Sequence, residues 1–251
     1  MDLEGDYDRR LLVRVDATGY GASDDVRQGE IQTMLGQVLE GAAGVAGFDR
    51  SRWHTQPAGD GELAVLPSDV RERSVVDRYP RALAEALTEA NGRVPANERL
   101  RVRLAVHYGM VSVGRLGFPG QGAVEVSRMV DGRPVRLAMR RSLASLVVVF
   151  SETIFRDSIE QNHTRLRPEE LREVEIKNKE FHRRAWLYLP GHDVHAVDLE
   201  PAAEPEPAER APRRPAAPND GPRPGTHIEN TFQAPVHAQR IVFGVSYGSE
   251  M

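Results

Sequence analysis

Cysteine is absent from this chain of 251 residues, which excludes disulfide bonds, thiolate catalysis and cysteine-ligated zinc. No apolar run reaches about 18 residues, so the sequence predicts no membrane span, and the acidic start at Met1–Glu4 does not resemble a secretion signal. Basic residues are not in excess, because the net charge is −4. We therefore expect a cytoplasmic protein with no nucleic-acid and no membrane partner.

The hydrophobic fraction of 40% is sufficient for a packed core. Strands are predicted at 11–16, 52–56, 62–66, 100–113, 146–150 and 185–189. Helices are predicted at 24–46, 75–91 and 123–139, the last with a break at 132–134. This order, with hairpins inside it, indicates an α+β domain in which helices pack against one sheet. We place the domain at residues 9–191, after an N-terminal tail at 1–8.

Composition changes beyond the domain. Residues 192–226 are rich in proline interleaved with alanine, glutamate and arginine, which predicts a disordered linker without a core. Residues 227–251 become rich in β-forming residues again, from Thr231 to Tyr247.

Two acids at strand ends are the main candidates for chemistry. Asp16 ends an apolar strand and leads into the glycine-rich turn Ala17–Gly21, and Asp60 lies at the tip of the turn Gly59–Gly61. Two carboxylates on neighbouring strand ends, beside backbone that can approach a phosphate, are a means of holding a divalent metal on a nucleoside triphosphate. The alternative is that both are ordinary turn acids.

Four segments in this order resemble the class III nucleotidyl cyclases, the adenylate and guanylate cyclases. They are Val15–Gly21, Gly59–Val65, Arg101–Val111 and Gly120–Asp131. The resemblance is strongest to the compact cyclase-like domains of actinobacterial signalling and conflict-system proteins, which suggests a role in antiviral defence. It implies a ferredoxin-like class III cyclase fold, with one mainly antiparallel sheet covered by helices.

The same resemblance implies a homodimer with composite sites at its interface. Asp16 and Asp60 would bind Mg²⁺ or Mn²⁺, and the backbone of Ala17, Thr18, Gly19 and Tyr20 would hold the triphosphate. Arg128 from the second chain would stabilise charge on the transferring phosphoryl group, a role that the reaction requires of some cation. The implied activity is formation of a 3′,5′-cyclic nucleotide with release of pyrophosphate.

Two family positions differ in this sequence. The asparagine expected one helical turn before Arg128 is replaced by Val124, with Glu125 beside it. The base-reading lysine is replaced by Gln56, and no acid is present near Gly117 to partner it. A glutamine offers both a donor and an acceptor, so Gln56 could read several bases, pyrimidines included.

The segment Asn230–Gly244 resembles the short amyloid signalling motifs related to the RIP homotypic interaction motif. Such a segment would recruit an effector protein through residues 227–251 by stacking with a like motif. The alternatives are an unstructured tail or a strand that docks on its own sheet.

Two hypotheses for the whole chain follow. The first is a nucleotidyl cyclase, for which the retained Asp16, Asp60 and Arg128 argue. The second is an inactive cyclase-fold nucleotide sensor or adaptor, which the missing asparagine favours.

Overall fold

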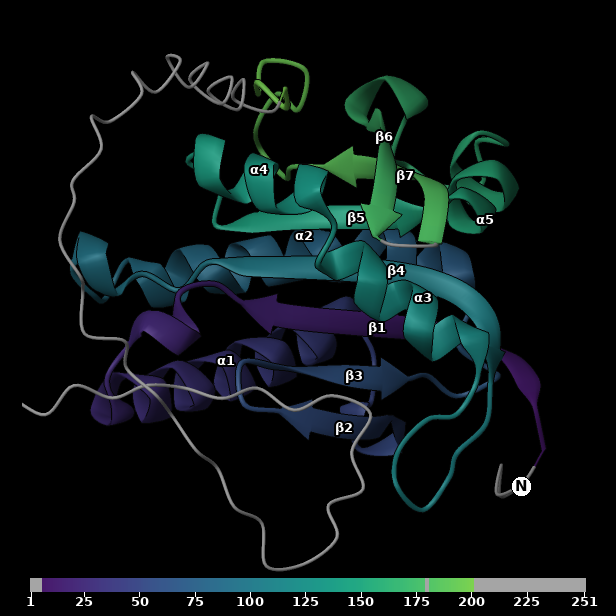
Figure 1. Cartoon of the computed structure of the whole chain (residues 1–251), viewed down its shortest axis with the longest axis horizontal. Coiled ribbons are helices and arrows are strands. Elements are labelled where there is room, and N and C mark those ends of the chain that lie inside the picture. Colours follow the sequence, from purple (N-terminus) through teal and green to yellow (C-terminus); the bar gives the residue numbers. More distant parts are fainter. Residues whose placement is uncertain (1–5, 179–180, 201–251) are drawn as a thin grey trace, which may run out of the picture. The chain divides into compact units, whose positions relative to one another are not determined.

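The computed structural model describes residues 6–178 and 181–200. Within these residues, seven strands form one sheet in the order β2-β3-β1-β4-β5-β7-β6 (Figure 1). Only the central pair β4 and β5 is parallel, and the other neighbours are antiparallel. The strands are β1 Asp8–Ala17, β2 His54–Ala58, β3 Gly61–Val65, β4 Val102–Val111, β5 Leu146–Ser151, β6 Arg172–Asn178 and β7 Phe181–Tyr188.

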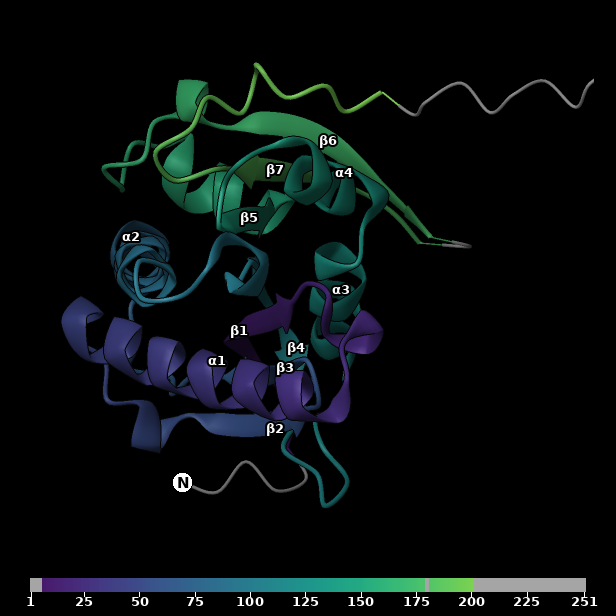
Figure 2. The same ribbon diagram turned by 90° about the vertical axis from the view of Figure 1, so that its left-hand side faces the viewer.

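Helices cover both faces of the sheet (Figure 2). One face carries α1 (Asp25–Ala46) and α2 (Glu72–Asn91), and the other carries α3 (Gln121–Val130) and α4 (Arg133–Arg141). A short α5 (Glu152–Ile154) follows β5. The alternation along β1 explains the two layers, because Val13 and Val15 pack toward α1 and α2 while Leu12 packs toward α3.

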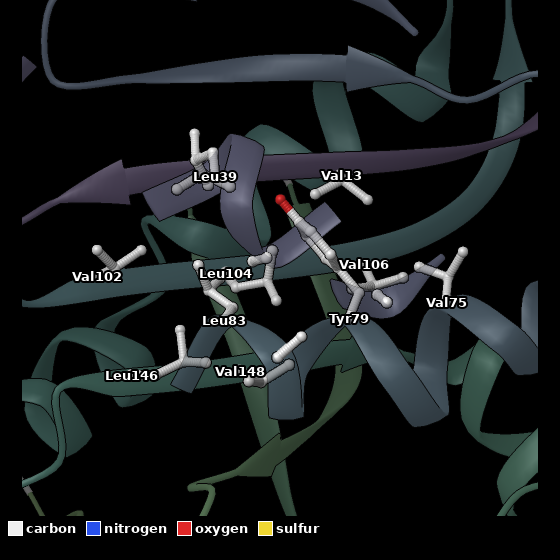
Figure 3. Close-up of a cluster of buried hydrophobic side chains, with 14 of the residues drawn as sticks. Val13, Leu39, Val75, Tyr79, Leu83, Val102, Leu104, Val106, Leu146 and Val148 are labelled. Atoms are coloured by element: carbon white, nitrogen blue, oxygen red, sulfur yellow. The ribbon is translucent and has the colours of Figure 1, made fainter. Parts of the chain in front are cut away.

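The larger core lies between the sheet and the pair α1 and α2. Figure 3 shows Tyr79 and Leu83 of α2 beside Leu104 and Val106 of β4, with Leu39 of α1 nearby. All five side chains are at most 2% exposed. Such complete burial of large apolar side chains is the main source of stability for this layer.

Both ends of α1 are fixed by capping residues next to the helix in the sequence. The carboxylate of Asp24 accepts a hydrogen bond from the backbone N–H of Arg27 at 2.8 Å, and Gly47 ends the helix in the left-handed conformation. This start places α1 directly after the turn Ala17–Gly21.

The α+β fold with one mainly antiparallel sheet is confirmed. The strand β6 is a feature that the sequence did not predict. Its segment Arg172–Asn178 is almost entirely polar and exposed, and only Ile176 is buried. The strand forms because its backbone pairs with β7 along its whole length at the sheet edge.

The packed part of the chain continues beyond residue 191. Val194 and Val197 are buried in the core beside α3 and α4, and Arg141 forms an ion pair with Asp198 at 2.7 Å. Most of the predicted linker and the whole of the segment 227–251 lie outside the described residues. Within residues 6–178 and 181–200, no helix has the length and hydropathy that a membrane span requires.

Candidate functional site

Asp16 and Asp60 meet where β1 lies beside the turn between β2 and β3. Asp16 pairs with Gly61 across the two strands, and the N–H of Ala17 donates to the carbonyl of Asp60 at 2.6 Å. A methyl group on Gly61 would lie 1.9 Å from the carbonyl oxygen of Val15. Only glycine therefore permits this close approach of the two backbones.

Asp16 is buried, with a side chain that is only 7% exposed. Burial raises the pKa of Asp16 to about 6; the guanidinium of Arg103 opposes this shift, and the neighbouring carboxylate of Asp60 adds to it by hydrogen bonding and repulsion. The two carboxylates thus lie close enough for Asp60 to disfavour the charge on Asp16, and Asp16 is mostly ionised at neutral pH.

Arg103 on β4 is a site residue that the sequence did not reveal. Its guanidinium forms an ion pair with Asp16, and it lies 3.5 Å from the carboxylate of Asp131 at the end of α3. The register of β1 and β4, in which Asp16 faces Arg103, creates this contact. A buried carboxylate with a cation on one side retains a further oxygen for a second cation.

The turn after β1 is held in place by hydrogen bonds, and the backbone N–H groups of Ala17 and Thr18 are already bonded to carbonyls. Gly19 adopts the left-handed conformation with φ 87°, and the N–H of Thr18 donates to the carbonyl of Arg101 at 2.9 Å. The amide of Gln32 donates to both the Tyr20 hydroxyl and the Gly59 carbonyl, at 2.9 and 3.0 Å. These bonds fix the turn against the Gly59–Gly61 hairpin.

A cavity of about 360 Å³ lies at this junction. Its lining includes the turn that was predicted to hold a triphosphate, the acid of the hairpin and several arginines. The lining residues are Ala17, Thr18, Gly19, Tyr20, Gly21, Asp60, Arg101, Arg103, Arg136, Met139 and Arg140. Arg101 has a structural role, because its guanidinium donates to the carbonyls of Ser142 and Ala144. Arg140 is exposed and forms no ion pair within the described part of the chain.

The residues fit a divalent ion held together with a phosphate. The described residues contain no group of three or more histidine, aspartate or glutamate side chains that could hold an ion. Asp16 and Asp60 supply two carboxylates, and Mg²⁺ is usually bound by one or two carboxylates plus substrate phosphates. The cavity beside these acids provides the space for such a phosphate.

Arg128 does not line this cavity. It lies on α3, where its guanidinium is over the ring of Phe181 at 5.4 Å, beside a separate hollow of about 400 Å³. The structure therefore does not bring Arg128 together with Asp16 and Asp60 in one pocket of a single chain.

Val124 and Glu125, which precede Arg128 on α3, face different parts of the structure. Val124 is 40% exposed and lines the same hollow as Arg128. Glu125 turns away from it, to within 3.5 Å of His107 and 3.6 Å of Arg183. Burial, with the charge of Arg9, lowers the pKa of His107 to about 4, so this histidine is neutral and acts as a packing residue.

Gln56 lies on β2, at the edge of the sheet and away from the 360 Å³ cavity. A methyl group on Gly117 would lie 2.5 Å from its Oε1 atom. The side chain of Gln56 therefore rests against the loop between β4 and α3, at the position where the sequence lacked an acidic partner.

No protein-family model and no curated protein matches the chain in sequence. Solved structures match its fold. An adenylate/guanylate cyclase/hydrolase from Silicibacter pomeroyi is 18% identical, with 75% of this chain and 100% of that chain covered and a TM-score of 0.53. The guanylyl cyclase Cya2 is 13% identical, with 78% and 99% covered and a TM-score of 0.51. A bacterial light-regulated adenylyl cyclase is 11% identical, with 72% and 52% covered and a TM-score of 0.50.

These likenesses confirm the resemblance to class III cyclase domains at the level of the fold. Identities of 11–18% do not carry activity, substrate or metal from one protein to another. The narrower resemblance to actinobacterial conflict-system proteins stays a prediction.

Proposed function

We propose that the chain is a cytoplasmic, homodimeric nucleotidyl cyclase that binds a nucleoside triphosphate with Mg²⁺ or Mn²⁺ and forms a 3′,5′-cyclic nucleotide. The observation that carries the proposal is the contact between Asp16 and Asp60 at the edge of an arginine-lined cavity. This contact combines the two groups that a metal-bound triphosphate needs, namely acids for the metal and cations for the phosphates.

The reaction joins the ribose 3′ oxygen to the α-phosphorus. The hydroxyl loses its proton to solvent, and the bond from the α-phosphorus to the bridging oxygen breaks to release pyrophosphate. When bound, a divalent ion would lower the pKa of the 3′-hydroxyl and neutralise phosphate charge. Asp16 and Asp60 would hold that ion, and the turn Ala17–Tyr20 would orient the phosphates.

Arginines supply the remaining charge. Arg103, Arg136 and Arg140 line the cavity and would bind the phosphates that leave. Arg128 would come from the second chain, because within one chain it borders a different hollow. A homodimer would bring it over the transferring group, where a cation stabilises the transition state.

Gln56 would contact the base. Gln56 rests against Gly117 and lies away from the 360 Å³ cavity, so it would reach the base only in a composite site that the second chain completes. No charged reader is present at either position, so a pyrimidine is as compatible with this pair as a purine.

A nucleotide sensor without turnover is the second candidate. Two observations favour it: Val124 offers no amide to orient a ribose, and Arg103 already occupies one oxygen of Asp16. In either case residues 227–251 would recruit an effector protein by β-stacking, and a defence role would follow from that partner.

Incubation of the full-length protein with each of the four ribonucleoside triphosphates and Mn²⁺ tests the proposal. We expect pyrophosphate and a cyclic product from at least one. Asp16→Asn should lower turnover at least a hundredfold and Arg128→Ala at least tenfold, whereas Asp69→Asn, an exposed acid paired with Arg52 at 2.9 Å, should have no effect.

Mixing the two impaired variants tests whether the active site is shared between two chains of a dimer or formed within one chain. Asp16→Asn and Arg128→Ala chains together should regain activity, because a mixed dimer holds one intact composite site. Nucleotide binding without any product would favour the sensor instead.

A further inference from the structure

A second cavity lies on the opposite side of α2 from the core. It has a volume of about 590 Å³, and its walls are the first half of α2 and the segment 163–165, which follows α5. None of its lining residues belongs to the 360 Å³ cavity beside Asp60. The two cavities are therefore separate.

Arginine dominates the lining of this second cavity. Five exposed arginines contribute to it: Arg71, Arg73, Arg78, Arg81 and Arg165. Among the described residues, none of the five forms an ion pair, although Arg81 contacts the hydroxyl of Tyr188. Some other surface arginines, for example Arg27, Arg52, Arg93 and Arg156, do have carboxylate partners.

Asp77 is the one carboxylate in the lining, and it is already engaged. Its Oδ1 atom accepts a hydrogen bond from the backbone N–H of Arg165 at 2.7 Å. This bond joins the two walls, which are 88 residues apart in the sequence. Outside the lining, the buried hydroxyl of Ser158 donates to Glu72 at the start of α2, which ties the chain before the second wall to the same helix.

The walls are thus held in place without any ligand. Thr164 is 7% exposed, and its hydroxyl donates to the carbonyl of Leu166 at 3.1 Å, which fixes the second wall further. Ser74 and His163 add a hydroxyl and an imidazole to the lining. Five guanidinium groups against one engaged carboxylate, in a chain with net charge −4, concentrate positive charge at this point.

We propose that this cavity binds a small molecule that carries two or more phosphate groups, at a site distinct from the nucleotide site. A guanidinium group can donate two hydrogen bonds to the oxygens of one phosphate. Within the described residues, the arginines of this cavity have no carboxylate partner that a phosphate would first have to displace. The volume is within the range of small-molecule sites and suits a ligand the size of a nucleotide. A concave site walled on two sides favours such a ligand over an extended polymer.

Calorimetric titration of the full-length protein with inorganic tripolyphosphate in EDTA tests the proposal. We expect Arg73→Glu/Arg78→Glu to weaken binding at the second cavity at least tenfold. Arg136→Glu/Arg140→Glu, which alters the other cavity, should leave that binding event intact. Arg93→Glu/Arg99→Glu, a matched change in charge outside both cavities, should preserve all binding.

Binding that is equal in Arg73→Glu/Arg78→Glu and in the matched control would overturn the proposal. If the charge reversal prevents folding, Arg71→Gln/Arg165→Gln gives the same comparison with neutral side chains. Stronger binding of a single-stranded RNA than of tripolyphosphate would also contradict it, in favour of a nucleic-acid surface. Different variants alter the two cavities. Failure of the proposed nucleotide site would therefore not change how the tripolyphosphate result at the second cavity is interpreted.

Discussion

Asp16 has a more constrained environment than a turn acid, because it is buried, paired with Arg103 and in contact with Asp60. Its raised pKa means that ionisation is unfavourable in the folded chain relative to the unfolded one. A divalent ion between the two acids would offset that cost, which gives a physical reason for the site to bind one.

Stability should depend on pH through this residue. Because the folded pKa of Asp16 is about 6 and its usual value is 3.8, the stabilising contribution of the protonated form is complete below about pH 4 and is lost as the pH rises through 6. We expect the free energy of unfolding of the wild type, relative to Asp16→Asn, to fall by about 1–3 kcal/mol across that window.

Denaturant unfolding at several pH values measures this difference. The comparison with Asp16→Asn removes the opposite contribution of His107, whose pKa of about 4 makes the chain less stable as the pH falls from 6.5. A difference between the two proteins that stays constant from pH 4 to 7 would show that Asp16 does not titrate in this window.

The sequence predicted Asp16 and Asp60 because a strand that ends on an acid, and an acid between two glycines, are local patterns. Arg103 could not be predicted in the same way. It lies 87 residues from Asp16, and only the register of β1 and β4 brings the two together. The register is set by packing on both faces of the sheet, which no local pattern specifies.

At the scale of elements, the hairpin of β2 and β3 is the part on which the site depends. Its turn must approach β1 closely enough for Asp60 to reach Asp16, and Gly61 permits this. Gly61→Ala should lower the free energy of unfolding by more than about 2 kcal/mol, since the added methyl group would overlap the carbonyl of Val15.

Gly36→Ala in α1 is the matched control, because nothing lies within 4 Å of its added methyl group. It should leave the stability unchanged or raise it by about 0.5–1 kcal/mol, as expected for alanine in place of glycine inside a helix. Equal stability of the two variants would contradict the close approach of the hairpin to β1.

The elements that the sequence predicted were those with a buried face. The helices α1 and α2 have clear apolar periodicity and the strand β5 is a continuous apolar run, and each begins or ends near its predicted place. β6 was not predicted because an exposed edge strand needs few apolar residues. Its partner β7, rather than its own composition, determines that it is a strand.

At the scale of the whole molecule, the two arginine-lined cavities share no lining residue. One adjoins the strand ends that carry Asp16 and Asp60, and the other adjoins α2. The fold was predictable because its motifs follow one another in a specific order along the chain. The composite site was not, because Arg128 lies beside a different hollow and a second chain would have to complete it.

Binding of a nucleoside triphosphate in the presence of Mn²⁺, followed as thermal stabilisation of the full-length protein, tests the central claim most directly. We expect at least one of the four ribonucleotides to stabilise the wild type by about 2.7 kcal/mol at a hundred times its dissociation constant. The effect should require Mn²⁺, disappear in Asp16→Asn and Asp60→Asn, and persist in Asp69→Asn. Stabilisation by no nucleotide, or stabilisation that is unchanged in Asp16→Asn, would contradict the claim that these two acids form a metal–nucleotide site.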